Sequence, residues 1–276
     1  MRFTIIFVLL LSSLALSCKK ENPYLLNKPE SVIWNPVTES YLISNVGSGF
    51  ILSLKDKQDF SIFNKANLDG PKGMAILGNN MYVADLKRVV GFDLQTGEKT
   101  FEQKVPDASF LNDVTASDGK MIYISDSDSS FIAMLNVVDK KLEIYKDKDL
   151  IKPNGLYYQK TDKDTLLYIV SMKDNTPIKV LNLGTKVLTD IPHTEMTRAD
   201  GITRDKMGEW LISSWADSTV YKYSPDFLMK STIKEKYQSP ADIFYNPVTD
   251  ELAIPQMQLN RVNFITIDDS LEKTNK

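Results

Sequence analysis

A repeat of about forty residues constrains the fold of this 276-residue chain more than any other feature. Six short segments share a polar residue followed by a mostly apolar stretch, and their polar positions are spaced by 42, 40, 42, 46 and 42 residues. The six positions are Glu30, Lys72, Asn112, Asn154, Asp200 and Asp242. Self-similarity at such a period indicates that each repeat is one supersecondary unit of a larger array.

Each repeat continues with the signals of short β-strands. A turn rich in Asp, Gly, Asn or Lys follows the polar segment, as at Gly78–Asn80, and a short apolar strand follows the turn, as at Met81–Ala84. No later segment shows a sustained helical period of apolar residues. Four such strands in each of six repeats predict an all-β fold, a six-bladed β-propeller of four-stranded blades. A β-sandwich, the alternative, does not account for the regular period.

The predicted propeller is one domain that covers residues 24–276. Its sixth repeat lacks a clear fourth strand, because Ile267 gives way to a charged tail. We therefore expect residues Tyr24–Leu26 to supply that strand and close the ring, since closure removes exposed sheet edges.

The first 23 residues predict export and attachment to a membrane. Met1–Thr4 carries a positive charge, Ile5–Leu16 is apolar, and Cys18 follows the small residue Ser17. The apolar run is shorter than the ~20 residues of a transmembrane helix and is typical of a signal peptide. Its end resembles the lipobox of bacterial lipoproteins, which implies a signal peptide over residues 1–17, a lipid on Cys18 and a tether over residues 18–23. We expect a lipid-anchored protein of the bacterial cell envelope, on the periplasmic side or the cell surface. An ordinary signal peptide that happens to end near a cysteine is the alternative.

Charge and cysteine content narrow the classes further. The chain has 33 basic and 36 acidic residues and no basic block, so nothing favours a nucleic-acid partner. Cys18 is the only cysteine, and once it carries a lipid no disulfide is possible. The core must therefore be held together by packing alone.

The six repeat positions are expected to form a ring, because the first strand of each propeller blade starts near the central axis. Every member of this ring is polar or charged. Unpaired carboxylates are too costly to bury, so Glu30, Asp200 and Asp242 require a cation. A metal ion is one candidate. The ammonium group of Lys72 is the other, and in that case the ring is a structural plug of ion pairs.

Four segments in register with the repeat carry a family resemblance: Pro29–Trp34, Asn112-Asp113, Pro153–Gly155 and Ala199–Gly201. In order and spacing they resemble the metal-site motifs of the family of senescence marker protein (regucalcin), gluconolactonase and luciferin-regenerating enzyme. The resemblance spans nearly the whole predicted mature chain, and it implies the same propeller fold.

The resemblance implies one divalent metal bound by Glu30, Asn154 and Asp200, with Asn112 holding a substrate or a water beside it. Carboxylate and amide oxygens suit Ca²⁺, with Mg²⁺, Mn²⁺ or Zn²⁺ as competitors. In this family the constellation opens lactones or related esters, and Asp200 is the candidate catalytic base or nucleophile. The candidate contacts to a small-molecule substrate are Asn112, Lys72 and Trp215.

Several residues have other readings. Phe110 stands where hydrolases of the family often have an arginine, and neither Lys72 nor Asp242 is a usual ligand there. Asn112 also fits a turn-capping role, because asparagine favours turns. His193, the only histidine, lies in a predicted loop and is expected at the surface rather than in catalysis.

The turns between the second and third strands should surround the ring and form the wall of a pocket. They are expected at Asn45–Ser48, Asp85–Arg88, Asp126–Ser130, Met172–Asn175, Trp215–Ser218 and Gln256–Asn260. Within them, Met172, Trp215 and Met257 are the candidates for apolar contact with a ligand.

Two functions remain open at this stage. The first is a metal-dependent hydrolase of lactones or related esters. The second is a non-catalytic propeller that binds a protein or small-molecule ligand, because Gly70–Ala75 together with Met81–Asp85 resembles an NHL-type repeat. Fold alone does not choose between them.

Overall fold

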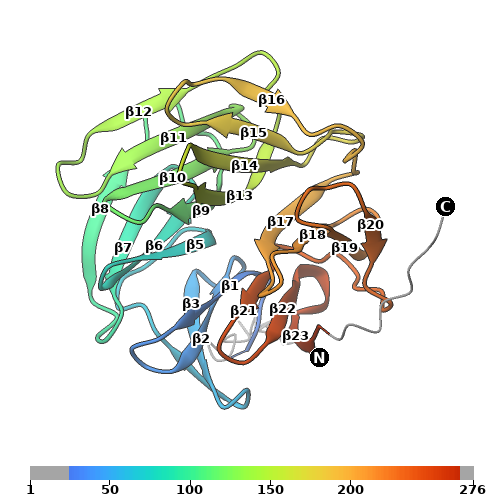
Figure 1. The fold of residues 1–276 in the computed structure, drawn as a ribbon. Coiled ribbons are helices and arrows are strands. Elements are labelled where there is room, and N and C mark those ends of the chain that lie inside the picture. Colours follow the sequence, from blue (N-terminus) through green and yellow to red (C-terminus); the bar gives the residue numbers. More distant parts are fainter. Residues whose placement is uncertain (1–24, 268–276) are drawn as a thin grey trace, which may run out of the picture.

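A computed structural model describes residues 25–267 of the chain. Six antiparallel sheets are arranged around a central axis, and the first strand of each sheet lies innermost (Figure 1). Five of these sheets have four strands, and the sixth has three within the described residues. The predicted all-β, six-bladed β-propeller is confirmed.

The first three blades follow one another along the chain. Blade 1 contains β1 (Pro29–Asn35), β2 (Ser40–Asn45), β3 (Phe50–Lys55) and β4 (Asp59–Ile62). Blade 2 contains β5 (Pro71–Leu77), β6 (Asn80–Asp85), β7 (Arg88–Asp93) and β8 (Lys99–Lys104). Blade 3 contains β9 (Leu111–Ala116), β10 (Met121–Asp126), β11 (Phe131–Asn136) and β12 (Leu142–Tyr145).

The other three blades complete the circle. Blade 4 contains β13 (Pro153–Lys160), β14 (Thr165–Ser171), β15 (Lys179–Asn182) and β16 (Leu188–Asp190). Blade 5 contains β17 (Ala199–Arg204), β18 (Trp210–Ser214), β19 (Thr219–Tyr223) and β20 (Lys230–Thr232). Blade 6 contains β21 (Phe244–Asn246), β22 (Glu251–Gln256) and β23 (Arg261–Thr266), with a 3-10 turn at Met257–Leu259.

The core lies between neighbouring blades. Six clusters of buried apolar side chains fill the six interfaces between one blade and the next. The last of them joins blade 1 to blade 6 through Val32, Tyr41 and Ala253. Apolar burial therefore continues around the whole circle, and burial of this kind is the main stabilising contribution to such a fold.

The ring closes by a different device from the one expected. Leu25 and Leu26 lie in no strand, so the prediction that this segment completes blade 6 is wrong for both, and Tyr24 lies outside the described residues. The reason is that the segment is bonded to the end of β2 and to the loop after β22, not to the edge of blade 6. The side chain of Asn45 donates to Leu25 O (3.2 Å) and accepts from Asn27 N (3.0 Å). Lys28 N then donates to Oδ1 of Asn260, which follows β22 in blade 6 (2.8 Å).

The predicted signal peptide, Cys18 and the tether lie outside the described residues. Within residues 25–267, the structure contains no helix of the length and apolarity that a membrane span requires. Export and lipidation therefore remain predictions from the sequence.

Candidate functional site

A bulge at the start of the first strand of blades 1 to 5 places side chains at the axis. In blades 1 to 5, the pairing of the first two strands skips two residues after its first pair, as between Pro29 and Val32 in β1. A bulge bends its strand and re-aims the side chains of the skipped residues. Two layers of residues follow from this. The first layer is Glu30, Lys72, Asn112, Asn154, Asp200 and Ala241, and the second layer is Ser31, Gly73, Asp113, Gly155, Gly201 and Asp242.

Asp242 belongs to the second layer, which corrects the prediction that placed it in the ring with Glu30. Pro240 bridges Gln256 at the end of β22, as Pro29 pairs with Asn45 at the end of β2. Ala241 is therefore the equivalent of Glu30. Asp242 itself bridges Ser31, its counterpart in blade 1. The sequence misleads here because Ala241-Asp242 matches Ala199-Asp200 letter for letter.

Glycines allow the second layer to close around the axis. A Cβ added to Gly73 would lie 2.3 Å from Asp113 Oδ1, and one added to Gly201 would lie 2.8 Å from Asp242 Oδ1. A Cβ on Gly155 would lie 2.2 Å from Asp200 O. The first strands of neighbouring blades therefore approach too closely for any side chain at these three positions.

The polar first-layer residues are deeply buried. Asn154 is 1% exposed and Asp200, the most accessible of the five, is 7% exposed. Burial, then the charges of Asp200 and Asp242, raises the pKa of Glu30 well above its usual value. Burial and the charge of Asp242 likewise raise the pKa of Asp200 to about 8. Ionisation of either carboxyl is costly without a nearby cation.

Two carboxylate oxygens of this layer have no partner. Oε2 of Glu30 and Oδ1 of Asp200 are buried and accept no hydrogen bond. A buried polar atom without a partner costs about 1–3 kcal/mol, and more when it is charged. Within residues 25–267 only a few buried side-chain oxygens are left in this state, and these two belong to the predicted metal-binding set.

Lys72 does not act as the direct counter-ion in this structure. Its Nζ lies 4.1 Å from the centre of the Phe110 ring and 3.4 Å from Gly70 O. Burial lowers the pKa of the Lys72 ammonium, although the charge of Glu30 opposes this. The interaction with Glu30 is thus through space, and neither unpaired carboxylate oxygen receives a hydrogen bond from the ammonium. Phe110 forms a cation–π contact with Lys72.

The two asparagines differ in their surroundings. Nδ2 of Asn154 donates to Ala199 O (3.3 Å), and a hydrogen bond from Asn154 moderates the rise in the pKa of Asp200. Nδ2 of Asn112 donates to Ser127 Oγ (3.0 Å) and contacts Met172 Sδ (3.7 Å). Asn154 therefore belongs to the carboxylate group, whereas Asn112 faces residues of the neighbouring loops.

The second layer adds two carboxylates, Asp113 and Asp242. The sequence predicted no ligand role for Asp113 and placed Asp242 in the wrong layer. Asp113 accepts hydrogen bonds from Val114 N (2.6 Å) and Leu156 N (2.7 Å), and Asp242 accepts one from Ser31 Oγ (2.5 Å). Burial raises the pKa of Asp113, and raises that of Asp242 to about 7. The signal for Asp113 was present in the motif Asn112-Asp113: an aspartate stands where three other repeats have glycine.

Cavities open at both ends of the axis. We call the end with the turns between second and third strands the loop face, and the end with the turns between first and second strands the turn face. On the loop face, one cavity of about 430 Å³ is lined by residues that include Phe110, Met172 and Trp215, and a second of about 410 Å³ lies between Trp215 and Met257. Met172, Trp215 and Met257 thus do line cavities at this face.

No first-layer residue lines either of these two cavities. Phe110 and Met172 lie between the larger one and the side chains of Lys72 and Asn112. The exposed His193 lines neither cavity. A ligand on the loop face would therefore meet Met172 and Trp215 before it reached Asp200.

The first layer fits a bound metal by its donor chemistry. Two buried, unpaired carboxylate oxygens, together with the amide oxygen that Asn154 carries, are the kind of donors that hard divalent cations select. No three His, Cys, Asp or Glu side chains in the described part of the chain gather closely enough to ligate an ion by themselves. A metal here would accordingly combine Glu30 and Asp200 with the amide of Asn154, and would complete its coordination with water.

Comparison with known proteins supports the architecture. No protein-family model matches the chain, and no curated protein matches it in sequence. A streptogramin B lyase structure superposes with a TM-score of 0.65 at 18% identity, over 86% of this chain and 80% of the lyase chain. The likeness is one of fold.

Two structures of virginiamycin B lyase from Staphylococcus aureus are similar in the same way. The first is a catalytically inactive histidine-to-alanine variant with quinupristin, with a TM-score of 0.67 at 15% identity over 90% of this chain and 83% of the other. The second, with selenomethionine, has a TM-score of 0.64 at 12% identity over 88% of this chain and 85% of the other. At these identities the comparison supports the propeller fold and does not assign an activity.

Proposed function

We propose that the protein is a metal-dependent hydrolase of lactones or related esters. One observation carries the proposal: Oε2 of Glu30 and Oδ1 of Asp200 are buried at the axis without a hydrogen-bond donor. Once ionised, carboxylates in this state require a cation, and Lys72 is engaged with Phe110 and Gly70 O instead. The resemblance of the surrounding motifs to the gluconolactonase-like family points to the reaction.

Glu30, Asn154 and Asp200 would hold the metal, with Ca²⁺ as the first candidate. A divalent cation bound there would polarise an ester carbonyl and lower the pKa of a bound water. Asp200 would serve as the general base toward that water, and the charge of the bound metal would lower its pKa from the raised value of the metal-free protein. Asn112 can donate its amide to a substrate oxygen in place of its present contacts with Ser127 and Met172.

Substrate would approach from the loop face. Met172 Sδ makes only a weak contact with Asn112, at 3.7 Å, and a thioether is a flexible cover. Its displacement would connect the cavity beside Trp215 with the first layer. The ammonium of Lys72, beneath Phe110, would then face any negative charge that develops on the opened ester.

The test is turnover of a panel of aliphatic and aromatic lactones by metal-stripped protein, with and without added Ca²⁺, Mg²⁺, Mn²⁺ or Zn²⁺. Asp200→Asn should lose the metal-dependent rate, whereas Asp56→Asn, an exposed carboxylate in the turn after β3, should retain it. Metal binding without turnover of any panel member would refute the hydrolase and would favour a non-catalytic, ligand-binding propeller.

The structural neighbours raise lyase chemistry as a second possibility, and the described residues give it little support. One neighbour is inactive when a histidine is replaced. The only histidine of this chain, His193, is exposed in the connection between β16 and β17 and lines none of the cavities at the axis. A lyase reaction here would need another proton acceptor.

We further propose that the protein is anchored in the cell envelope by a lipid on Cys18. The support is the sequence around residues 14–18, which resembles a lipobox. Mass spectrometry of the N-terminal peptide from membranes should show a diacylglyceryl group on Cys18. Cys18→Ser should lose this modification, and a wild-type N-terminal peptide without a diacylglyceryl group on Cys18 would refute the assignment.

A further inference from the structure

A separate cavity occupies the turn-face end of the axis. It has a volume of about 440 Å³, within the range of small-molecule sites. Its rim includes Pro36, Pro247 and Val248, all exposed, so it opens to solvent on this face. The metal site proposed above lies in the first layer, and none of its three ligands lines this cavity.

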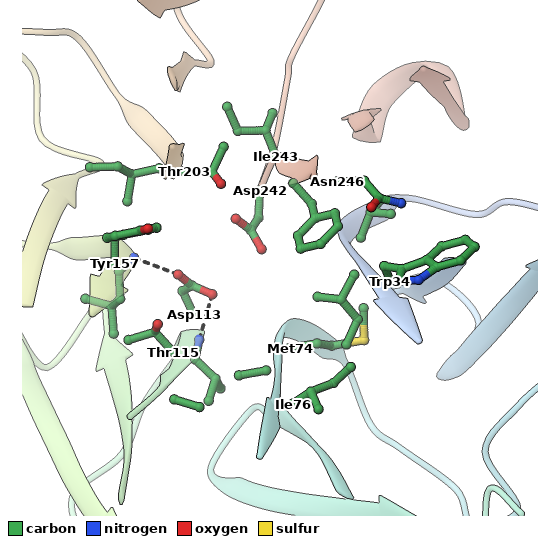
Figure 2. Close-up of a pocket in the computed structure, with 18 of the residues that line it drawn as sticks. Trp34, Met74, Ile76, Asp113, Thr115, Tyr157, Thr203, Asp242, Ile243 and Asn246 are labelled. Carbon is green, nitrogen blue, oxygen red and sulfur yellow. Dashed lines mark hydrogen bonds between the residues drawn. The ribbon is translucent and has the colours of Figure 1, made fainter. Parts of the chain in front are cut away.

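The walls of this cavity are apolar and partly aromatic. Trp34, Met74 and Ile76 form one side, and Tyr157 lies across from them (Figure 2). Its lining, all of it within the described residues, contains no lysine, arginine or histidine. An anionic ligand would therefore find no counter-charge here.

Two carboxylates form the inner end. Asp113 and Asp242 come from opposite sides of the axis and point toward each other at the centre of the cavity (Figure 2). Both oxygens of Asp113 accept backbone hydrogen bonds, one from Val114 N and one from Leu156 N. Oδ2 of Asp242 accepts from Ser31, and the half-buried Asp242 keeps its other oxygen available to the cavity.

The two carboxylates and the apolar walls of the cavity favour one class of ligand over others by its charge and shape. A divalent metal needs about six oxygen ligands, and most of the carboxylate oxygens here are already used by the protein. A neutral apolar molecule would leave the two carboxylates desolvated without a counter-charge. A protonated amine with a carbon chain meets both requirements. Its ammonium group is a compact donor that pairs with Asp242, and its carbon chain contacts the apolar wall.

We propose that the turn-face cavity binds a protonated primary amine with an apolar body, its ammonium group against Asp242 and Asp113 and its carbon chain along Trp34 and Met74. The aromatic faces add cation–π attraction for the charged head as it enters. This proposal does not rest on the proposed hydrolase, and the cavity lies at the opposite end of the axis from the cavities beside Trp215.

The direct test is isothermal titration of the protein with three probes of equal length: n-hexylammonium, n-hexanol and n-hexanoate. The ammonium should bind at least tenfold more tightly than the alcohol, and hexanoate should show no binding. Equal affinity for ammonium and alcohol, or no ammonium binding, would overturn the proposal.

Variants locate the bound amine. Asp242→Asn should weaken hexylammonium binding at least tenfold, and Asp56→Asn should leave it unchanged. Val248→Arg adds a positive charge at an exposed rim position (75% exposed) without disturbing the core, and should weaken the ammonium at least threefold. Trp34→Phe should abolish the change in tryptophan fluorescence on binding, because Trp210 is buried elsewhere and Trp215 lies on the loop face. Binding that none of these changes affects would place the amine elsewhere and contradict the proposal.

Discussion

Replacing Asp200 with asparagine should stabilise the metal-free protein at alkaline pH. Burial and the charge of Asp242 raise the pKa of Asp200 to about 8 in the folded protein, against about 3.9 for an unfolded aspartate. The folded state thus holds a proton that the unfolded state has already released. Stability therefore falls as pH rises from the unfolded pKa to the folded one, and the loss is complete above about pH 8. Asparagine has the same shape and no proton to lose.

The size of the effect follows from the two pKa values. Between pH 5.5 and 8.5, the proton linkage of one such carboxyl amounts to about 3 kcal/mol. Glu30 and Asp242 titrate in the same cluster and share the effect, so we expect a measured difference of about 1–3 kcal/mol.

The assay is urea unfolding in the presence of chelator at both pH values. Asp200→Asn should gain stability relative to the wild type on going from pH 5.5 to 8.5, while the exposed control Asp56→Asn should follow the wild type. If the difference in unfolding free energy between Asp200→Asn and the wild type is the same at both pH values, the argument from a buried, uncompensated carboxyl is refuted.

Three further substitutions probe the axis and the core. Asp113→Ala should lower the unfolding free energy by about 2–4 kcal/mol in urea, because two buried backbone N–H groups lose their acceptor; a loss below about 1 kcal/mol would contradict this role. Gly155→Ala should lower the unfolding free energy by more than about 2 kcal/mol, since its Cβ would meet Asp200 O at 2.2 Å. Gly119→Ala, in an open turn, should change it by no more than about 0.5 kcal/mol. Similar melting temperatures for the two variants would argue against the close approach of the strands at Gly155. Trp210→Ala should cost about 3–5 kcal/mol by calorimetry, because the indole packs against three aromatic rings between blades 4 and 5, and a near-neutral result would show that the interface repacks.

Much of the fold could be predicted because a propeller repeats its local chemistry. The spacing of Glu30, Lys72, Asn112, Asn154 and Asp200 marks five bulges that the structure places at equivalent positions. Period and turn residues recur in every blade, so each repeat supports the interpretation of the others. The sixth blade was less predictable, since its polar residue is shifted by one position and only pairing reveals this.

The candidate site was only partly predictable for a physical reason. Sequence spacing indicates which residues reach the axis but not which atoms meet there. Lys72 was the alternative to a metal ion as the counter-ion, and only the structure shows that its ammonium lies over the Phe110 ring. The role of Asp113 depends on a backbone donor from a neighbouring blade, Leu156 N, which no local pattern predicts. The depth of the first layer beneath Met172 depends on side-chain packing across loops.

The most direct test of a cation at the axis is the metal content of the purified protein after equilibrium dialysis against Ca²⁺. We predict one tightly bound ion per wild-type chain, none in Asp200→Asn, and retention in Lys72→Met, which removes the ammonium but none of the proposed ligands. A wild-type chain that binds no Ca²⁺, Mg²⁺, Mn²⁺ or Zn²⁺ would contradict the account, because protonation alone would then keep Glu30 and Asp200 neutral at the axis.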